Sequence, residues 1–250
     1  MKTQREFLKS DLWDKWQESL TDQKKKIPLP PIQKPYPEDA DLIDLIPADE
    51  LTIGKDTNLY DAINQRKSWR KYADDPLNIE ELSFLLWATQ GVQEMIRSGK
   101  FSRRTVPSGG CRHPFETYLL INRVTGLEPG IYRYLPLDHK LLYLYNEDGL
   151  IEKVNDSFMG QYIKGCAVAF MWTTIPYRTE WRYTFLSPKI IAQDSGHLCQ
   201  NLYLACAAIG AGTCAIGAYD QDKMDAVLRV DGVDEFAVYG APVGKIKPAK

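Results

Sequence analysis

The pattern of apolar and polar positions divides the chain into an N-terminal extension and a folded region that begins near residue 56. In residues 5–20 apolar side chains recur at every fourth position between charged ones, which predicts an amphipathic helix. Residues 24–37 combine lysines with five prolines, so they can form neither a helix nor a central strand, and we expect them to run extended over the surface. We therefore divide the chain into an N-terminal helix with a Pro-rich extension (1–55) and a main domain (56–250).

Helix signals recur along the main domain. One helix, capped by Asp56, is expected to end at residues 66–70, and a second is expected to begin at Asn78, which forms a capping-box pattern with Glu81. The longest helix should begin at Ser187 and end near residue 210, with a proline in its first turn. A short helix that Asp220 could cap is expected between residues 219 and 235.

Strand signals lie between these helices, at residues 117–123, 131–135, 141–145, 166–174, 213–219 and 235–239. The second and third of them read as a hairpin. Because strands and helices are mixed without strict βαβ alternation, an α+β fold is favoured over a doubly wound parallel sheet.

Composition narrows the classes of function. Apolar residues make up 44% of the chain and charged residues 26%, with a net charge of −2, so no global field attracts nucleic acid or an anionic membrane. No apolar run approaches the roughly 20 residues of a membrane span, and the first residues lack the apolar core of a signal peptide, so we expect a cytoplasmic protein. The five scattered cysteines and three histidines predict neither a disulfide framework nor a metal site.

Two segments could bind a ligand. Residues 66–70, Arg-Lys-Ser-Trp-Arg, place cations and a hydroxyl where a helix gives way to extended chain, a combination suited to a phosphate monoester. Taken alone, such a run is more often a solvated basic turn. Residues 107–110, Pro-Ser-Gly-Gly, permit close approach of the backbone to a flat ligand.

The order of these segments resembles that of the nitroreductase family, in particular its SagB/ThcOx-type branch of FMN-dependent dehydrogenases. The resemblance is carried by four motifs between about residues 57 and 247: Arg-Lys-Ser-Trp-Arg-Lys-Tyr at 66–72, Arg-Thr-Val-Pro-Ser-Gly-Gly at 104–110, Gly-Leu-Glu-Pro-Gly-Ile-Tyr at 126–132, and Gly-His-x-x-Gln-Asn-Leu-Tyr-Leu-Ala at 196–205. It implies a central, mostly antiparallel sheet flanked by helices, in an intertwined homodimer with two FMN sites.

The resemblance also implies site residues. The flavin phosphate, ribityl chain and pyrimidine edge would meet Arg66, Lys67, Ser68 and Arg70, with Lys245, and less certainly Lys247, completing the phosphate site. Pro107, Ser108 and Gly109, with Gly110 in the same loop, would lie against the flavin ring, in this fold usually from the other subunit. A backbone N–H of Ile216 or Gly217 would face flavin N5.

One departure concerns the chemistry. Members that oxidise azolines carry a Lys-Tyr pair where this chain has Arg182 and Tyr183. Arginine stays protonated and is a poor general base, whereas Tyr183 could exchange a proton or be a structural residue. His113 is a candidate for the rim of the pocket, and His197 fits a hydrogen-bonded core residue better than a catalytic one.

The sequence thus predicts an FMN-dependent oxidoreductase in which NADH or NADPH reduces the flavin and a small acceptor, such as a nitroaromatic compound or a quinone, then reoxidises it. One alternative is a SagB-type dehydrogenase of a peptide azoline or another C–N substrate. A second is a flavin-binding protein with little turnover. The expected partners are a small-molecule substrate and a second copy of the chain, and neither nucleic acid nor a membrane is expected.

Overall fold

A seven-stranded sheet forms the centre of the protein, whose structure is a computed structural model describing residues 5–247. Its strand order is β1-β6-β5-β4-β7-β9-β8, and every neighbouring pair is antiparallel. The strands are β1 (Leu42–Asp44), β4 (Phe115–Ile121), β5 (Gly130–Leu135), β6 (Lys140–Tyr145), β7 (Val168–Thr174), β8 (Ala211–Thr213) and β9 (Phe236–Lys245). The predicted α+β class and mostly antiparallel sheet are confirmed.

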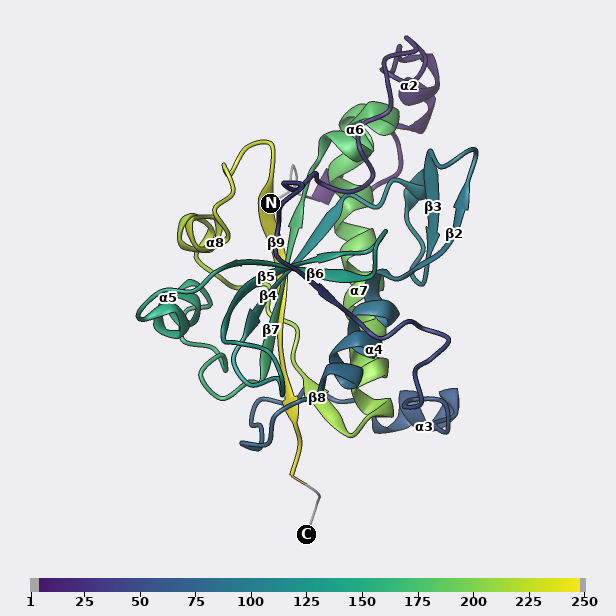
Figure 1. Cartoon of the computed structure of the whole chain (residues 1–250). Helices are drawn as coiled ribbons and strands as arrows, with labels where there is room; N and C mark the ends of the chain where they lie inside the picture. Colours follow the sequence, from purple (N-terminus) through teal and green to yellow (C-terminus); the bar gives the residue numbers. More distant parts are fainter. Residues whose placement is uncertain (1–4, 248–250) are drawn as a thin grey trace.

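Helices cover both faces of this sheet (Figure 1). On one face α4 (Ile79–Gln90) packs against α7 (Ser187–Ala208), and on the other α5 (Leu150–Ser157) packs against α8 (Gln221–Leu228). Successive side chains of a strand point to opposite faces, so Leu119 belongs to the apolar cluster under α4 and α7, and Leu120 to the cluster under α5 and α8. The result is a three-layer domain with a core on each side of the sheet.

The local signals in the sequence account for several of these elements. Asn78 and Glu81 form the predicted capping box of α4, and Asp220 caps α8 by accepting a hydrogen bond from the Lys223 N–H. The first helix of the main domain, α3 (Leu59–Gln65), is capped by Asn58 rather than by Asp56. The sequence did not predict α5, α6 (Tyr177–Tyr183), β1, or the separate hairpin of β2 (Val92–Ile96) and β3 (Phe101–Arg104).

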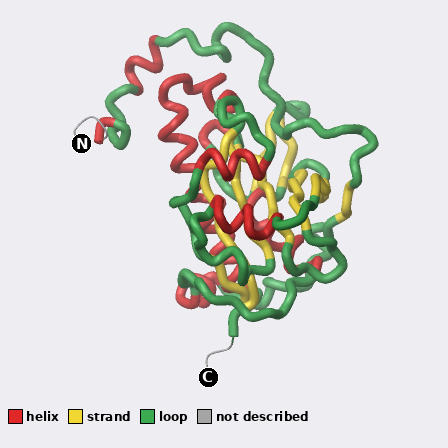
Figure 2. Tube along the Cα trace, turned by 90° about the vertical axis from the view of Figure 1, so that its left-hand side faces the viewer, coloured by secondary structure: helices red, strands yellow, loops and turns green. Residues whose placement is uncertain are grey.

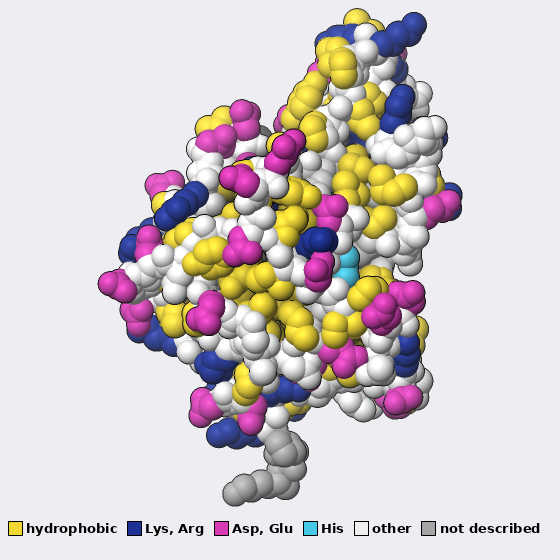
Figure 3. Space-filling view, viewed as in Figure 1, with side chains coloured by type: hydrophobic (Ala, Val, Ile, Leu, Met, Phe, Trp, Pro, Cys, Tyr) yellow, Lys and Arg dark blue, Asp and Glu magenta, His cyan; other side chains and the backbone are white. Residues whose placement is uncertain are grey.

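The predicted helix over residues 5–20 is wrong in extent. Helix α2 spans only Trp13–Glu18, and it buries none of its residues. Trp13 and Trp16 of α2 contact Tyr183, but the leucines at the other predicted positions are exposed. Helical segments without packing are marginal in water, so four-residue spacing alone does not sustain a continuous helix here. We call residues 5–20 the N-terminal arm. Several of its side chains, among them Leu8, Leu12 and Leu20, are exposed, and apolar side chains are prominent on the arm in Figure 3.

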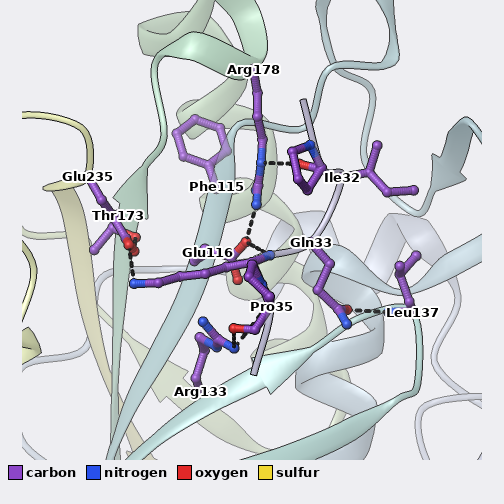
Figure 4. A network of polar contacts seen from close by, with 12 residues as sticks. Ile32, Gln33, Pro35, Phe115, Glu116, Arg133, Leu137, Thr173, Arg178 and Glu235 are labelled. Atoms are coloured by element: carbon purple, nitrogen blue, oxygen red, sulfur yellow. Dashed lines mark hydrogen bonds and ion pairs between the residues drawn. The ribbon is translucent and has the colours of Figure 1, made fainter. Parts of the chain in front are cut away.

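Residues 21–37, which we call the strap, include the segment 24–37 that was predicted to be extended. Residues 22–26 form turns, and the prediction is confirmed from residue 27 onward. The strap leaves the N-terminal arm and crosses the body of the protein as a loop (Figure 2). A backbone amide of the strap, at Lys34, donates to Glu116 Oε1 at 2.9 Å, and Arg178 donates to the same oxygen at 2.6 Å (Figure 4). Both side chains of this ion pair are at most 3% exposed.

Further buried groups hold the strap along its length. Side chains of Arg178, Arg104 and Arg133 donate to strap carbonyl oxygens at 2.8–3.1 Å. The Lys34 ammonium lies 2.5 Å from Glu235, a buried carboxylate that also accepts hydrogen bonds from Tyr118 and Thr173. The extension continues into β1, the edge strand of the central sheet, and is therefore packed against the main domain.

Candidate active site

The predicted cationic cluster lies directly after α3, which ends at Gln65. Its chain runs beside the edge strand β8, because Ser68 bridges Thr213 and the Trp69 N–H donates to the Thr213 carbonyl oxygen at 2.9 Å. A side chain at Gly212 would place its Cβ 2.6 Å from Trp69 Cγ, so this close approach requires glycine. The backbone of the cluster is thus fixed beside β8, whereas the side chains of Lys67, Ser68 and Arg70 are exposed.

A cavity of about 420 Å³, which we call the cationic cavity, opens beside this cluster. It is lined by residues 64–67, 69, 203, 206, 207, 210–213, 246 and 247. Three of these lining residues are cations, Arg66, Lys67 and Lys247, and none of them is a carboxylate. An anionic group such as a phosphate monoester suits this set of side chains.

Tyr203 of α7 connects the cluster to the strand that follows β8. Its hydroxyl accepts a hydrogen bond from the Ala215 N–H at 2.8 Å and lies 2.9 Å from Ser68 Oγ. The Arg66 guanidinium lies over the same ring, 5.3 Å from its centre, within range of a cation–π contact. One tyrosine therefore orients two of the predicted ligand-binding residues.

Two predicted members of the phosphate site lie elsewhere. Lys245, at the end of β9, forms an ion pair with Glu81 of the α4 capping box and does not line the cationic cavity. Arg70 is exposed and has its guanidinium 5.9 Å from the centre of the Tyr162 ring. Lys247, the less certain candidate from the sequence, does line the cavity.

Ile216 and Gly217 follow β8, and only one of them has an available N–H. The Ile216 N–H donates to the Gly240 carbonyl oxygen at 2.8 Å, and the Gly240 N–H donates back at 3.2 Å. Gly217 is exposed, and within residues 5–247 its N–H has no protein acceptor. Of the two predicted donors, Gly217 is therefore the one that could meet a ligand.

A second cavity, of about 810 Å³, lies further along α7 and β9, and we call it the large cavity. Its walls come from the end of β7, from α6, from the first part of α7, and from residues 219, 221, 233, 234 and 236–238. Along β9, Val243 pairs with β8 beside the cationic cavity, Gly240 bonds Ile216, and Ala237 lines the large cavity. At about 3.3 Å per residue these three positions follow one another at roughly 10 Å intervals.

The loop at residues 107–110 is held by Asp194 of α7, a residue that the sequence did not single out. Asp194 accepts from Ser108 Oγ at 2.6 Å and from the Gly109 N–H at 3.1 Å. Burial raises the pKa of this carboxyl group, and the two hydrogen bonds act in the opposite direction. In the sequence, the sign that could have pointed to Asp194 is that it is a single acidic residue among the apolar residues of α7.

The two candidate proton-transfer residues lie beside this loop. A Cβ on Gly110, whose φ is +61°, would lie 2.7 Å from the Tyr183 hydroxyl and 3.1 Å from Arg182 Cδ. Tyr183 is 8% exposed. Trp16, a residue of the N-terminal arm, covers the Tyr183 ring, with ring centroids 5.7 Å apart. The structure thus brings together the Pro-Ser-Gly-Gly loop and the Arg-Tyr pair.

Both histidine expectations need correction. His113 is 4% exposed, so it does not lie at a pocket rim, and burial followed by Arg104 lowers its pKa to about 3. His197 is not a core residue, because its side chain is 46% exposed, with Nδ1 3.8 Å from Asp194 Oδ1. Neither histidine lines the cationic cavity or the large cavity.

Within one chain the predicted residues form two clusters on different sides of α7. The two cavities use residues 188, 191, 192, 195, 203, 206 and 207 of this helix, whereas the loop contacts Ile190 and Asp194. At about 100° per residue, the loop side lies roughly 155° around the helix from the cavity side. The cationic cavity and Gly217 therefore belong to one cluster, and the loop with Tyr183 belongs to another.

Comparison with known proteins agrees with this architecture. A sequence model described as the nitroreductase family matches residues 63–245. The nitroreductase-assigned protein MJ1384 of Methanocaldococcus jannaschii is 28% identical over 191 residues, which cover 76% of this chain and 92% of that protein. In the crystal structure of a nitroreductase-assigned protein from Ralstonia eutropha JMP134, the fold is similar, with a TM-score of 0.67, 24% identity, and coverage of 89% of this chain and all of the other.

A further relative is a toxin-processing protein, which the chain matches over part of its length. The trifolitoxin-processing protein TfxB of Rhizobium leguminosarum bv. trifolii is 27% identical over 149 residues. The similarity covers 58% of this chain and 40% of that protein. Residues 5–62, which include the strap, lie outside the part of the chain that matches the family model.

Proposed function

The chain belongs to the nitroreductase family, and on that premise we propose that this oxidoreductase is FMN-dependent, takes reducing equivalents from NADH or NADPH, and passes them to a small acceptor such as a nitroaromatic compound or a quinone. The observation that carries the proposal is the alignment of three features along α7 and β9. They are the cationic cavity, the exposed N–H of Gly217, and the large cavity. In that order the three features would receive the phosphate of FMN, its ring, and an acceptor beside the ring.

The residues of the cationic cavity fit the phosphate of FMN. Arg66, Lys67 and Lys247 supply positive charge, and no lining carboxylate opposes it. Ser68, held by Tyr203, supplies a hydroxyl next to the cavity. In the proposed complex Gly217 N–H would bond the flavin ring near N5. When bound, FMN would supply the hydride chemistry, while the chain binds the phosphate, orients the ring and leaves one side open to the acceptor.

The loop at residues 107–110 and Tyr183 do not belong to the flavin site of their own chain in this proposal. Because residues 107–110 and Tyr183 lie on another side of α7, we assign them to the flavin site of a partner subunit in a homodimer. A mixture of Arg66→Ala and Asp194→Ala chains tests this assignment. Mixed dimers would contain one site free of both substitutions and would regain turnover, whereas a site built within one chain would stay defective in both subunits, and a monomer by light scattering would exclude the dimer.

The cofactor is tested by an anaerobic visible spectrum of the purified protein before and after addition of NADH or NADPH. Flavin bands that bleach on addition are the expected result, and the faster donor identifies the nucleotide. Arg66→Ala should lose flavin and keep its far-UV circular dichroism, because a surface cation seldom contributes much stability. Arg229→Ala, which removes an exposed cation elsewhere, should keep its flavin. A protein that binds no added FMN would exclude the proposal, and slow bleaching would favour a flavin-binding protein with little turnover.

A SagB-type dehydrogenase is the second candidate, and the similarity to TfxB favours it. Oxidation of a C–N substrate requires a base, and Arg182 is unsuited to that role. Tyr183 would then have to accept the proton. Tyr183→Phe should abolish such an oxidation, whereas acceptor reduction by NAD(P)H should persist within about threefold, since it uses no protein base.

A further inference from the structure

The large cavity carries an uneven distribution of charge. Its lining contains two carboxylates, Glu180 from α6 and Asp234 from the loop before β9, and no lysine, arginine or histidine. Neither carboxylate forms an ion pair with any residue in 5–247. The two cavities along α7 and β9 thus have opposite character, one cationic and the other acidic.

The two carboxylates influence each other. Burial raises the pKa of Glu180, and the nearby charge of Asp234 raises it further. Each carboxylate comes from a separate element, so the chain places two like charges at one cavity without a protein cation between them. A cationic ligand would relieve this repulsion, whereas an anionic ligand would add to it.

The remaining walls suit a flat ring with a polar group. Tyr177, Tyr219 and Phe236 supply aromatic surface on which a planar molecule can pack. Thr174 also lines the cavity, is 1% exposed, and has a hydroxyl without a hydrogen-bond partner in the structure. A buried hydroxyl without a partner is costly unless a ligand or water bonds it.

We propose that the large cavity is the acceptor site and that it selects a planar ring carrying an ammonium or another cationic group. In this arrangement Glu180 and Asp234 bind the cation, the aromatic walls hold the ring, and Thr174 hydrogen-bonds a polar substituent. The inference rests on the proposed function, because only a flavin held at Gly217 would make this cavity the acceptor site. The inference specifies the charge of the acceptor, which membership of the family does not specify.

A matched series of acceptors tests the charge preference. 4-Nitrobenzylammonium, 4-nitrobenzyl alcohol and 4-nitrobenzoate share the nitro group and the ring but differ in charge. Steady-state reduction should give kcat/KM values that fall in this order, by about tenfold at each step, mainly through KM and less so at high salt. In Glu180→Gln/Asp234→Asn the three kcat/KM values should converge to within about threefold.

A control variant and a binding measurement test the charge preference separately from the proposed oxidoreductase activity. Glu152→Gln removes a carboxylate of α5 that does not line the large cavity, and it should keep the wild-type order. Calorimetric binding of the three compounds to the oxidised protein needs no turnover. Selective ammonium binding by a protein without flavin turnover would sustain the charge preference and refute the acceptor role. Turnover with equal or tighter binding of the benzoate, or no binding of any probe, would overturn the inference.

Discussion

Trp16 and Tyr183 lie stacked, with ring centroids 5.7 Å apart and ring planes inclined by 28°. The indole N–H of Trp16 also donates to the carbonyl oxygen of Arg182 at 3.0 Å. Trp16 belongs to the extension, outside the residues that match the family, whereas Tyr183 ends α6. An element outside the family match therefore covers the tyrosine that is the candidate for proton transfer.

Trp16→Ala should remove both contacts and uncover Tyr183. The lost aromatic stacking and hydrogen bond predict a decrease of about 2 kcal/mol in the free energy of unfolding, with little change in flavin content. Urea denaturation followed by circular dichroism measures the decrease, and absorbance measures the flavin. Leu8→Ala, in the same arm and 71% exposed, should leave the midpoint unchanged. Equal midpoints for the two variants would show that α2 is not docked on Tyr183.

Tyr203→Phe should weaken FMN binding without unfolding the protein. The phenol bonds Ser68 Oγ and the Ala215 N–H, and it therefore orients both sides of the cationic cavity. Loss of these bonds predicts about a tenfold rise in the Kd for FMN, measured by fluorescence titration of the apoprotein. Tyr60→Phe, on the exposed side of α3, is the matched control. Retention of wild-type affinity in Tyr203→Phe would contradict the assigned phosphate site.

Glu116→Gln should destabilise the protein through the strap. The substitution leaves Arg178 buried and charged, a situation that typically costs about 3–5 kcal/mol. Hydrogen exchange should also accelerate in residues 27–37, because the Lys34 N–H loses its charged acceptor. Glu94→Gln breaks an exposed ion pair with Arg103 and should cost less than about 1 kcal/mol. If the two variants were equally stable, the buried pair would not hold the strap.

His113 should make the protein sensitive to acid. Its pKa is lowered from 6.5 to about 3 in the folded protein, so below pH 6.5 the unfolded chain binds a proton that the folded chain does not. Its contribution to stability is therefore complete above pH 6.5 and is lost as the pH falls toward 3, by up to about 4 kcal/mol at pH 3.5.

The slope of unfolding free energy against pH measures this contribution. Between pH 7 and pH 4, His113→Gln should have a flatter slope than the wild type, whatever its stability at pH 7. His197→Gln, which alters a half-exposed ring, should keep the wild-type slope. Parallel slopes for all three proteins would mean that His113 has the same pKa in the folded protein as in the unfolded chain.

The sequence by itself determined the elements whose causes are local. The capping box of α4 needs only Asn78 and Glu81, three residues apart, and the β5–β6 hairpin needs two apolar runs with a short turn between them. Local pattern failed where tertiary packing decides, as in α2, where four-residue spacing exists but no partner surface completes a longer helix.

The candidate site likewise has features that the sequence predicts and features that only tertiary packing decides. The residue types of the cationic cluster and of the Pro-Ser-Gly-Gly loop are readable along the chain, and so is the resemblance that orders them. Only the tertiary structure paired Lys245 with Glu81, placed Asp194 under the loop, laid Trp16 on Tyr183, and put two carboxylates at one cavity. These relationships join residues far apart in sequence, and their energies depend on burial and distance, which no local pattern specifies.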